Sequence, residues 1–209
     1  MIAVRGPLIG AAILFILVLG LGLAVTAGWT AGADHAVGSA LALRAGQGQD
    51  GLISLWWWIS WSGGGGQRYA IVAALALLLG LWHRWHSGLI LAVMAVLSNS
   101  TSGLLKDAFA RPRPDLVPHL DPVNSLSYPS GHATSAALVY LLFALLVPTV
   151  RRPVWLSVAA VLAFLTGFSR ITLGVHWPTD LIGGWMLGTA FALLGVAVAR
   201  LSGRYGQVA

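Results

Sequence analysis

The chain of 209 residues contains no cysteine, no glutamate and a single lysine, and its acidic residues number only six. Without cysteine it can form no disulfide bond, iron–sulfur cluster or thiolate zinc site. Charged residues make up 9% of the chain, whereas hydrophobic residues make up 57%. This shortage of charge excludes an ordinary soluble globular protein and predicts an integral membrane protein.

Basic residues outnumber acidic ones and give a formal net charge of +6. In a soluble chain this excess would suggest nucleic acid as a partner. Here the basic residues lie singly at the edges of apolar segments and form no stripe, so we expect no nucleic-acid partner. The expected surroundings are a lipid bilayer, and no obligate protein partner is inferred.

Six apolar segments approach the roughly 20 residues that a helix needs to cross a bilayer. They cover residues 8–29, 69–85, 88–105, 131–149, 153–169 and 180–199. The first is longer than the about 7–15 apolar residues of a signal peptide, so we interpret it as a retained span. The expected fold is all-α: one membrane-embedded domain over residues 1–209, built as a bundle of six transmembrane helices.

Cytoplasmic loops retain lysine and arginine, which can orient such a bundle. Each side of the six-span arrangement carries six cations, so their number alone decides nothing. One side has short connections without acidic residues and carries Arg5, Arg84, Arg151, Arg152, Arg200 and Arg204. The other side holds every aspartate and carries Arg44, Arg68, Lys106, Arg111, Arg113 and Arg170. We therefore expect both termini inside and the second group on the outer, periplasmic face of a bacterial inner membrane.

The first outer loop, residues 30–68, contains a tryptophan-rich segment from Leu52 to Trp61, followed by Ser62 and the glycines Gly63 to Gly66. Tryptophan prefers the headgroup level, which predicts an amphipathic interfacial segment. Alternatively, the segment is a flap over a lipid entrance, with the glycines as its hinge. Polar residues 98–102 end the third span, and we expect them to face the bundle interior near the functional site.

Three polar clusters occur where apolar segments end, at residues 106–114, 128–132 and 169–180. Lys106, Arg113 and Arg170 are all expected at the same membrane face. Converging cations repel one another unless a multiply charged anion lies among them. A phosphoryl group meets that requirement, and an arginine can hold its oxygens through two parallel N–H bonds.

The remaining polar residues of the clusters complete a phosphoryl-transfer site. Ser130 and Gly131 stand where the fourth span begins, so their backbone N–H groups and the serine hydroxyl can bind phosphate oxygens. His176 precedes Asp180 by one helical turn and is the candidate nucleophile, because the carboxylate fixes its tautomer. His132 is the candidate general acid. We expect structural roles for His35, His83 and His86, whereas His119 is a possible headgroup contact.

These spacings resemble the signature of the type 2 phosphatidic acid phosphatase superfamily, which also includes vanadium haloperoxidases and some bacterial acid phosphatases. The signature consists of Lys-x6-Arg-Pro, Pro-Ser-Gly-His and Ser-Arg-x5-His-x3-Asp. All three parts occur here without a mismatch, from Lys106 to Pro114, from Pro129 to His132 and from Ser169 to Asp180. Arg111 has the wrong spacing from Lys106, so Arg113 matches the signature arginine.

The resemblance implies a phosphoryl site formed by Lys106, Arg113, Ser130, Gly131 and Arg170. It further implies that His176 attacks in line, His132 protonates the departing oxygen and Asp180 orients His176. Water then hydrolyses the phosphohistidine without a metal or other cofactor. The expected function is a lipid phosphatase acting on phosphatidic acid, phosphatidylglycerol phosphate, undecaprenyl pyrophosphate or a lipid A phosphate. The residues rank none of these substrates firmly, although the cations, with Arg111 in reserve, are sufficient for a pyrophosphate.

Other functions use the same residue types. A serine hydrolase with Ser130, His176 and Asp180 leaves the cations unexplained. A zinc ion on His132, His176 and Asp180 would be repelled by them. A membrane transporter or binding protein for anions or lipid phosphates is the main alternative, although no broken spans or inverted repeat support it. A haloperoxidase is disfavoured because those relatives are soluble.

Overall fold

The computed structural model describes residues 2–147 and 149–202. Within these residues all regular secondary structure is helical. In chain order the helices are α1 (Ile2–Thr26), α2 (Ala31–Leu41), α3 (Asp50–Trp61), α4 (Gln67–Leu81), α5 (Trp85–Phe109), α6 (Gly131–Leu146), α7 (Arg152–Thr172) and α8 (Pro178–Leu201).

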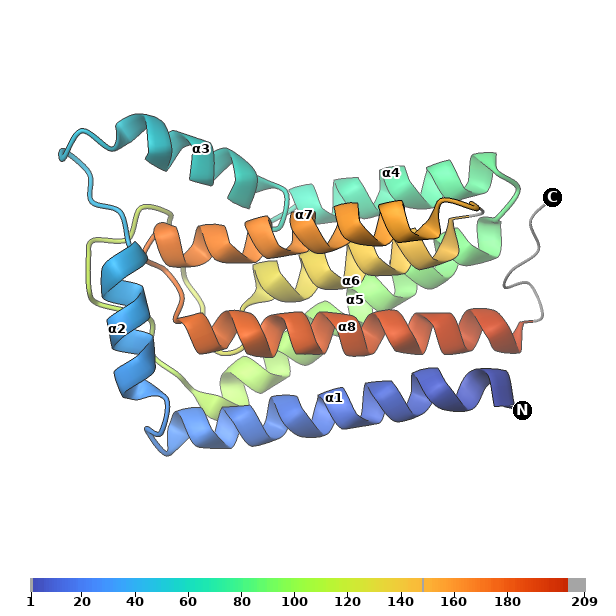
Figure 1. The fold of residues 1–209 in the computed structure, drawn as a ribbon, viewed down its shortest axis with the longest axis horizontal. Coiled ribbons are helices and arrows are strands. Elements are labelled where there is room, and N and C mark those ends of the chain that lie inside the picture. Colours follow the sequence, from blue (N-terminus) through green and yellow to red (C-terminus); the bar gives the residue numbers. More distant parts are fainter. Residues whose placement is uncertain (1, 148, 203–209) are drawn as a thin grey trace.

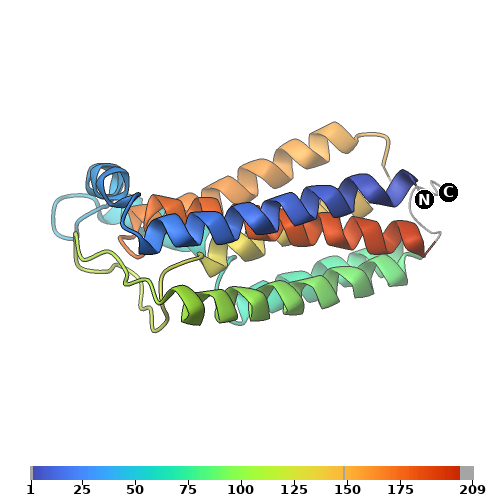
Figure 2. The ribbon, with the colours of Figure 1, turned by 90° about the horizontal axis from the view of Figure 1, so that it is seen from below.

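Helices α1 and α4 to α8 lie side by side along one axis, whereas α2 and α3 lie toward one end of the bundle (Figure 1). In the turned view, α8 lies between α7 on one side and α5 with α4 on the other (Figure 2). The connections from α4 to α5 and from α6 to α7 lie at the opposite end, together with the start of α1 and the end of α8. This arrangement separates the two groups of cations as the sequence predicted, except that Arg204 lies outside the described residues.

Helices α6 and α8 form the centre of the bundle because glycine on α8 lets their backbones approach closely. A Cβ atom at Gly184 would lie 2.6 Å from the carbonyl oxygen of Ser130, and one at Gly188 would overlap the carbonyl oxygen of Thr134. Small residues commonly permit such contacts between membrane helices. The start of α6 is thereby held against α8.

The outer helices turn large apolar side chains away from the protein. Ile16 of α1 is 68% exposed, Val161 of α7 is 56% exposed, and Leu89 of α5 is 64% exposed. Continuous apolar surface of this extent is typical of contact with lipid and not with water. Among the described residues, four helices are long and apolar enough to cross a membrane, namely α1 from Val4 onward, α5, α7 and α8.

The other two predicted spans correspond to α4 and α6, which have 15 and 16 residues. At 1.5 Å per residue, 16 residues extend about 24 Å, which is less than the roughly 30 Å hydrocarbon thickness. Helix α6 is enclosed by protein along most of its length. Irregular backbone can lie at membrane depth where protein surrounds it, so the short α6 leaves room for polar groups below the bundle rim.

The helices begin and end at residues that differ from the boundaries of the predicted spans. Helix α1 ends at Thr26, not at residue 29, and α2 was not predicted within the first outer loop. Lys106, Arg170 and Asp180 lie on the terminal turns of helices, whereas we expected Lys106 and Arg170 beyond the spans. Helical hydrogen bonding continues past each apolar run because these polar side chains find partners inside the bundle. Residue 148, in the predicted fourth span, lies outside the described residues.

Candidate active site

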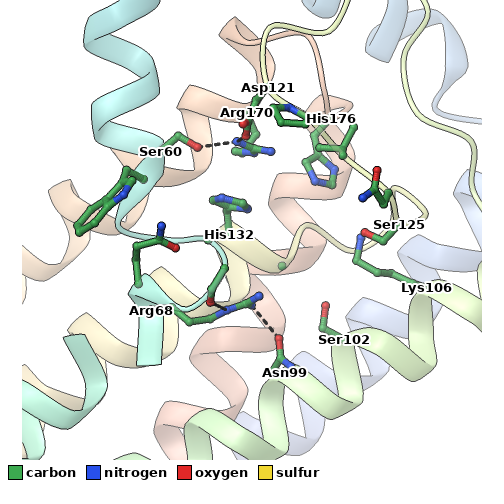
Figure 3. Close-up of a pocket in the computed structure, with 18 of the residues that line it drawn as sticks. Ser60, Arg68, Asn99, Ser102, Lys106, Asp121, Ser125, His132, Arg170 and His176 are labelled. Atoms are coloured by element: carbon green, nitrogen blue, oxygen red, sulfur yellow. Dashed lines mark hydrogen bonds and ion pairs between the residues drawn. The ribbon is translucent and has the colours of Figure 1, made fainter. Parts of the chain in front are cut away.

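A polar cavity of about 440 Å³ opens at the end of the bundle near α2 and α3 (Figure 3). Six of the eight predicted site residues line it: Lys106, Arg113, Gly131, His132, Arg170 and His176. They come from α5, α6, α7 and two connecting loops. Segments distant in the sequence therefore bring two histidines and three cations to one cavity.

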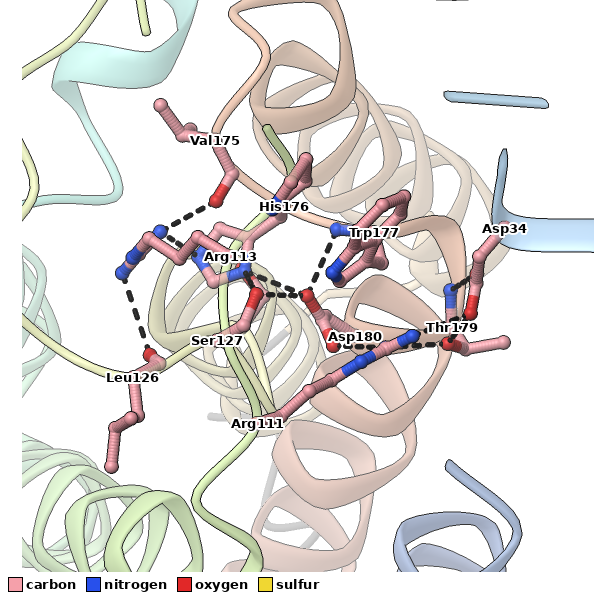
Figure 4. A network of polar contacts seen from close by, with 12 residues as sticks. Asp34, Arg111, Arg113, Leu126, Ser127, Val175, His176, Trp177, Thr179 and Asp180 are labelled. Carbon is pink, nitrogen blue, oxygen red and sulfur yellow. Dashed lines mark hydrogen bonds and ion pairs between the residues drawn. The ribbon is translucent and has the colours of Figure 1, made fainter. Parts of the chain in front are cut away.

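The imidazole of His176 is buried and held from behind by Asp180, as Figure 4 shows. The two residues interact through His176 Nδ1 and Asp180 Oδ2, 3.1 Å apart. The same carboxylate oxygen accepts hydrogen bonds from the Ser127 hydroxyl at 2.5 Å and from the backbone N–H of Trp177 at 2.9 Å. These donors fix the carboxylate, and the carboxylate in turn favours the tautomer with a proton on Nδ1.

The second oxygen of Asp180 belongs to a buried charge network. Arg111 donates from Nη1 to Asp180 Oδ1 at 2.5 Å and from Nη2 to Asp34 Oδ2 at 2.6 Å. Asp34 lies on α2 and also accepts hydrogen bonds from the backbone and hydroxyl of Thr179. A guanidinium between two buried carboxylates offsets their desolvation, since each charge has an opposite partner. Helix α2 is thereby tied to the start of α8.

Arg113 lies on the other side of the His176 ring. Its Nη1 donates to the carbonyl oxygen of Val175 at 2.6 Å and lies 3.2 Å from His176 Nε2. With the proton on Nδ1, Nε2 is the acceptor in this contact and carries a lone pair. Burial, and then the charge of Arg113, lower the pKa of His176 well below its usual value of 6.5. The ring is therefore neutral near pH 7 and available as a nucleophile.

Arg113 keeps its charge in this environment. Burial, with a further contribution from Arg170, lowers the pKa of the Arg113 guanidinium to about 10. Lys106 donates to the carbonyl oxygens of Leu126 and Ser127. Neither cation forms an ion pair with a carboxylate in the described parts of the chain. Both can therefore contribute full charges to a bound anion.

Arg170 is buried and has a different set of partners. Its Nη1 donates to Asp121 Oδ2 and to Ser60 Oγ, both at 2.5 Å. Its Nε has no hydrogen-bond partner among the described residues. Ser60 belongs to α3, and Trp57 and Trp61 of the same helix line the cavity. The tryptophan-rich segment is therefore a helix that contacts the site.

The start of α6 agrees only partly with the prediction. Gly131 lines the cavity, but Ser130 does not. The Ser130 backbone N–H donates to the carbonyl oxygen of Asp180 at 3.0 Å, so this donor already has a partner within the protein. Because α8 approaches so closely, it occupies that donor. The Ser130 hydroxyl is buried and has no partner within the described chain.

Two residues considered for contact with the substrate lie outside the cavity lining. Arg111 does not line the cavity and is committed to Asp34 and Asp180, so it is not a reserve cation for a diphosphate. His119 also lies outside the cavity lining, and its Nε2 is 2.7 Å from the carbonyl oxygen of Pro114. The polar end of α5 was placed correctly only in part: Asn99 and Ser102 line the cavity, whereas Ser100 is exposed.

Sequence reasoning missed several residues at the site. Arg68 of α4 lines the cavity beside Gln67, and Asp121 is the one aspartate among the described residues that line it. Asp34 and Ser127 support Asp180 from behind. The signal for Arg68 was present, because it was expected at the same membrane face as the site. Nothing in the sequence pointed to Asp34, because a single aspartate in a loop does not reveal which distant residue it pairs with.

The protein resembles known sequences over the region that carries this site. The model of the PAP2 superfamily matches residues 87–204. Phosphatidylglycerophosphatase B of Bacillus subtilis is 38% identical over 109 residues, which cover 48% of this chain and 52% of that protein. An undecaprenyl-diphosphatase of Sulfolobus acidocaldarius is 32% identical over 141 residues, covering 64% of this chain and 65% of that protein. The chain thus spans about half to two thirds of the length of these curated relatives.

A solved structure is similar over nearly the whole chain. It is the transmembrane PAP2-type phosphatidylglycerolphosphate phosphatase from Bacillus subtilis, with a TM-score of 0.82 and 28% sequence identity. The match covers 91% of this chain and 96% of the other. Together with the apolar helices, it identifies the chain as an integral membrane protein.

Proposed function

Because this chain belongs to the PAP2 superfamily, we propose that it is a metal-independent phosphatase of membrane lipids, cleaving a phosphomonoester or a diphosphate. The observation that carries the proposal is the environment of His176. Its Nε2 faces a cavity rich in cations, while Asp180 holds Nδ1 from behind. An imidazole held in this way can attack phosphorus, and the cations can stabilise the charge of the transition state.

In the first step, His176 Nε2 forms a bond to phosphorus as the bond from phosphorus to the lipid oxygen breaks. The phosphoryl oxygens are bound by Lys106, Arg113, Arg170 and the Gly131 backbone. Ser130 lies outside the cavity lining, but its hydroxyl has no partner among the described residues and is the proposed further donor. His132, protonated when the anionic phosphoryl group lies among the cations, gives its proton to the departing oxygen, so the lipid leaves as an alcohol or as a lipid phosphate. The cationic phosphohistidine is stabilised by Asp180 across the ring.

In the second step, water attacks the phosphohistidine and the P–N bond breaks. His132, now neutral, accepts the proton of that water and regains its starting state. Inorganic phosphate is released and His176 returns as a neutral imidazole. Neither step calls for a metal, since side-chain cations supply the positive charge.

The membrane arrangement is part of the proposal. The domain, residues 1–209, spans the inner membrane six times, with α4 and α6 as the two short crossings. Helix α3 lies at the lipid interface, and the cavity opens at the outer, periplasmic face with both termini inside. The lipid phosphate enters from the bilayer beside the tryptophans of α3, whose rings prefer the headgroup level.

The test is phosphate release from lipid substrates by the purified protein, combined with trapping of the intermediate. The wild-type protein is expected to form an acid-labile, base-stable phosphoprotein and to be insensitive to EDTA. His176→Ala is expected to lower kcat by about 10⁴-fold or more, as loss of a nucleophile does, while lipid-phosphate binding persists. Lipid or anion transport that survived His176→Ala would favour the transporter instead.

The serine and zinc mechanisms have less support. The Ser130 hydroxyl has no hydrogen bond to His176 among the described residues, so the nucleophile–base contact of a serine triad is missing. A zinc ion at His176 Nε2 would stand against the Arg113 guanidinium, 3.2 Å from that nitrogen. A base-labile phosphoprotein or loss of activity in EDTA would reverse these judgements.

A further inference from the structure

Arg68 is a cation of the cavity that the three-part signature does not include. It lies in the first turn of α4, and its side chain reaches toward the start of α6 (Figure 3). Its Nη1 donates to Asn99 Oδ1 at 2.8 Å and lies 3.3 Å from Ser135 Oγ, while Nε donates to the carbonyl oxygen of Gly65 at 3.1 Å. Three contacts from three segments thus hold the guanidinium in one orientation.

These partners are all neutral. No carboxylate in the described parts of the chain pairs with Arg68, and its Nη2 has no hydrogen-bond partner there. Arg111, by contrast, meets two carboxylates, and Arg170 meets one. A partly buried guanidinium without a counter-charge is costly, and a bound anion would remove that cost. The arrangement therefore indicates that the Arg68 guanidinium is oriented to bind an anion.

The location of Arg68 connects it with the leaving group. A Cβ atom at Gly131 would lie 3.9 Å from Arg68 Nη1, so the guanidinium adjoins the start of α6, where His132 follows. Figure 3 shows Arg68 on the opposite side of His132 from Arg170. Since His132 is the proposed proton donor to the departing oxygen, Arg68 lies next to the part of the substrate that leaves.

The glycines before α4 allow their backbone to lie close to the His132 ring. A Cβ atom at Gly64 would lie 2.5 Å from His132 Nε2, and one at Gly63 would lie 3.1 Å from His132 Cδ2. Larger residues at these positions would displace the His132 ring or the turn. The glycine segment therefore permits close contact around His132, which is a different role from the hinge considered in the sequence analysis.

We propose that Arg68, oriented by Asn99, forms a second anion subsite that binds a further phosphate on the leaving side of the substrate. A lipid diphosphate carries such a group, and so does phosphatidylglycerol phosphate, whereas phosphatidic acid does not. With a diphosphate, His176 takes the terminal phosphoryl group, the bridging P–O bond breaks, and His132 protonates that oxygen. The lipid monophosphate that leaves stays paired with Arg68 until it is released. This inference rests on the proposed function.

The test compares substrates that differ in the second phosphate. Wild type, Arg68→Gln and Arg68→Lys are assayed on a polyprenyl diphosphate, phosphatidylglycerol phosphate and phosphatidic acid. A lost charge-assisted hydrogen bond costs roughly 10- to 100-fold in binding. We expect Arg68→Gln to lower kcat/KM on at least one of the two-phosphate lipids by about 10-fold more than it lowers kcat/KM on phosphatidic acid. The loss caused by Arg68→Lys should be intermediate. The lipid that shows the larger loss of kcat/KM identifies the source of the second phosphate.

The control is Arg44→Gln, an exposed arginine outside the cavity lining, which should leave the substrate ratio unchanged. Equal losses on all three lipids with Arg68→Gln would overturn the subsite, because a merely structural role affects every substrate alike. The melting temperature of each variant separates misfolding from loss of binding.

A binding measurement separates failure of this inference from failure of the proposed function. In the His176→Ala background, inorganic pyrophosphate should raise the melting temperature more than orthophosphate does, and Arg68→Gln should abolish that difference. If no lipid is hydrolysed by the wild type but this preference is present and depends on Arg68, the anion subsite stands and the phosphatase proposal falls. An equal response to the two anions in both proteins would contradict the subsite.

Discussion

The two sides of the His176 imidazole carry opposite arrangements of charge. Behind the ring, Asp34, Arg111 and Asp180 are mutually paired and almost entirely buried (Figure 4). Every charge there has an opposite partner within 2.6 Å. This side holds the His176 ring in place, and its ion pairs and neutral donors leave no charge uncompensated.

In front of the ring, the cavity contains Lys106, Arg113, Arg170 and Arg68 but only one aspartate, Asp121. Lys106 and Arg113 are held by carbonyl oxygens, which orient the cations without neutralising them. The comparison shows how one protein uses the same residue type in two ways. Arg111, paired with two carboxylates, stabilises the structure, whereas Arg113, paired with carbonyl oxygens, is left ready for an anionic substrate.

The largest effect is expected from removing the negative charge of Asp180 while the size of its side chain is kept. Asp180→Asn retains the size of the side chain but turns an amide toward Arg111 or toward the donors of Ser127 and His176. The His176 tautomer is then no longer enforced, and kcat should fall by about 10³- to 10⁴-fold, as in other oriented-histidine enzymes. Phosphate release by the purified variant measures it. Asp107→Asn, at an exposed position of α5, is the matched control; similar activities of the two variants would contradict the role of Asp180.

Removing one cation from each side sharpens the comparison. Arg111→Met leaves Asp34 and Asp180 buried without a counter-charge and should lower stability by about 3–5 kcal/mol. Lys106→Met removes a charge that repels its neighbours, so the melting temperature should hold or rise while kcat/KM falls by about 10²- to 10³-fold. Melting temperatures in one detergent and phosphate release are the measurements. Equal destabilisation by both substitutions would show that the two sides do not differ.

A smaller effect is expected in the pH profile. Burial and the charge of Arg113 lower the pKa of His176, so the neutral nucleophile persists below its usual pKa of 6.5. In Arg113→Met the pKa of His176 should rise toward 6.5, because one cause of its depression is gone. The acid limb of the kcat/KM profile should then move to higher pH. Wild type and variant are measured on the same lipid, so that the titration of the substrate affects both profiles equally. Arg44→Gln should not move it, and an unmoved limb in Arg113→Met would rule out this electrostatic link.

The comparison also separates what could be predicted from what could not. Most of the long helices were predictable because a long run of apolar residues indicates a membrane-embedded helix without reference to the rest of the chain. The pocket residues Lys106, Arg113, His132, Arg170 and His176 were predictable for a related reason. Their types and their spacing within short segments indicate a site for phosphoryl transfer. Helix α2 escaped prediction because its mixed composition lacks a strong apolar period.

The roles of the remaining arginines could not be predicted from their position in the chain. Arg111 and Arg113 are two residues apart, yet one is paired behind His176 and the other faces the cavity. The partner that draws Arg111 away, Asp34, lies 77 residues earlier. A choice between partners so distant depends on how α2 packs against α8, which no local pattern records.

By itself, the sequence determined the chemistry of the site: a histidine with a carboxylate one turn away, a second histidine at a helix start, and cations at the ends of apolar segments. These features are local, so spacing along the chain suffices to define them. Only the tertiary structure decided which cations are neutralised and which are left for an anion. That outcome depends on the oxygen atoms each guanidinium meets after folding, as when Asn99, 31 residues away, orients Arg68 without cancelling its charge.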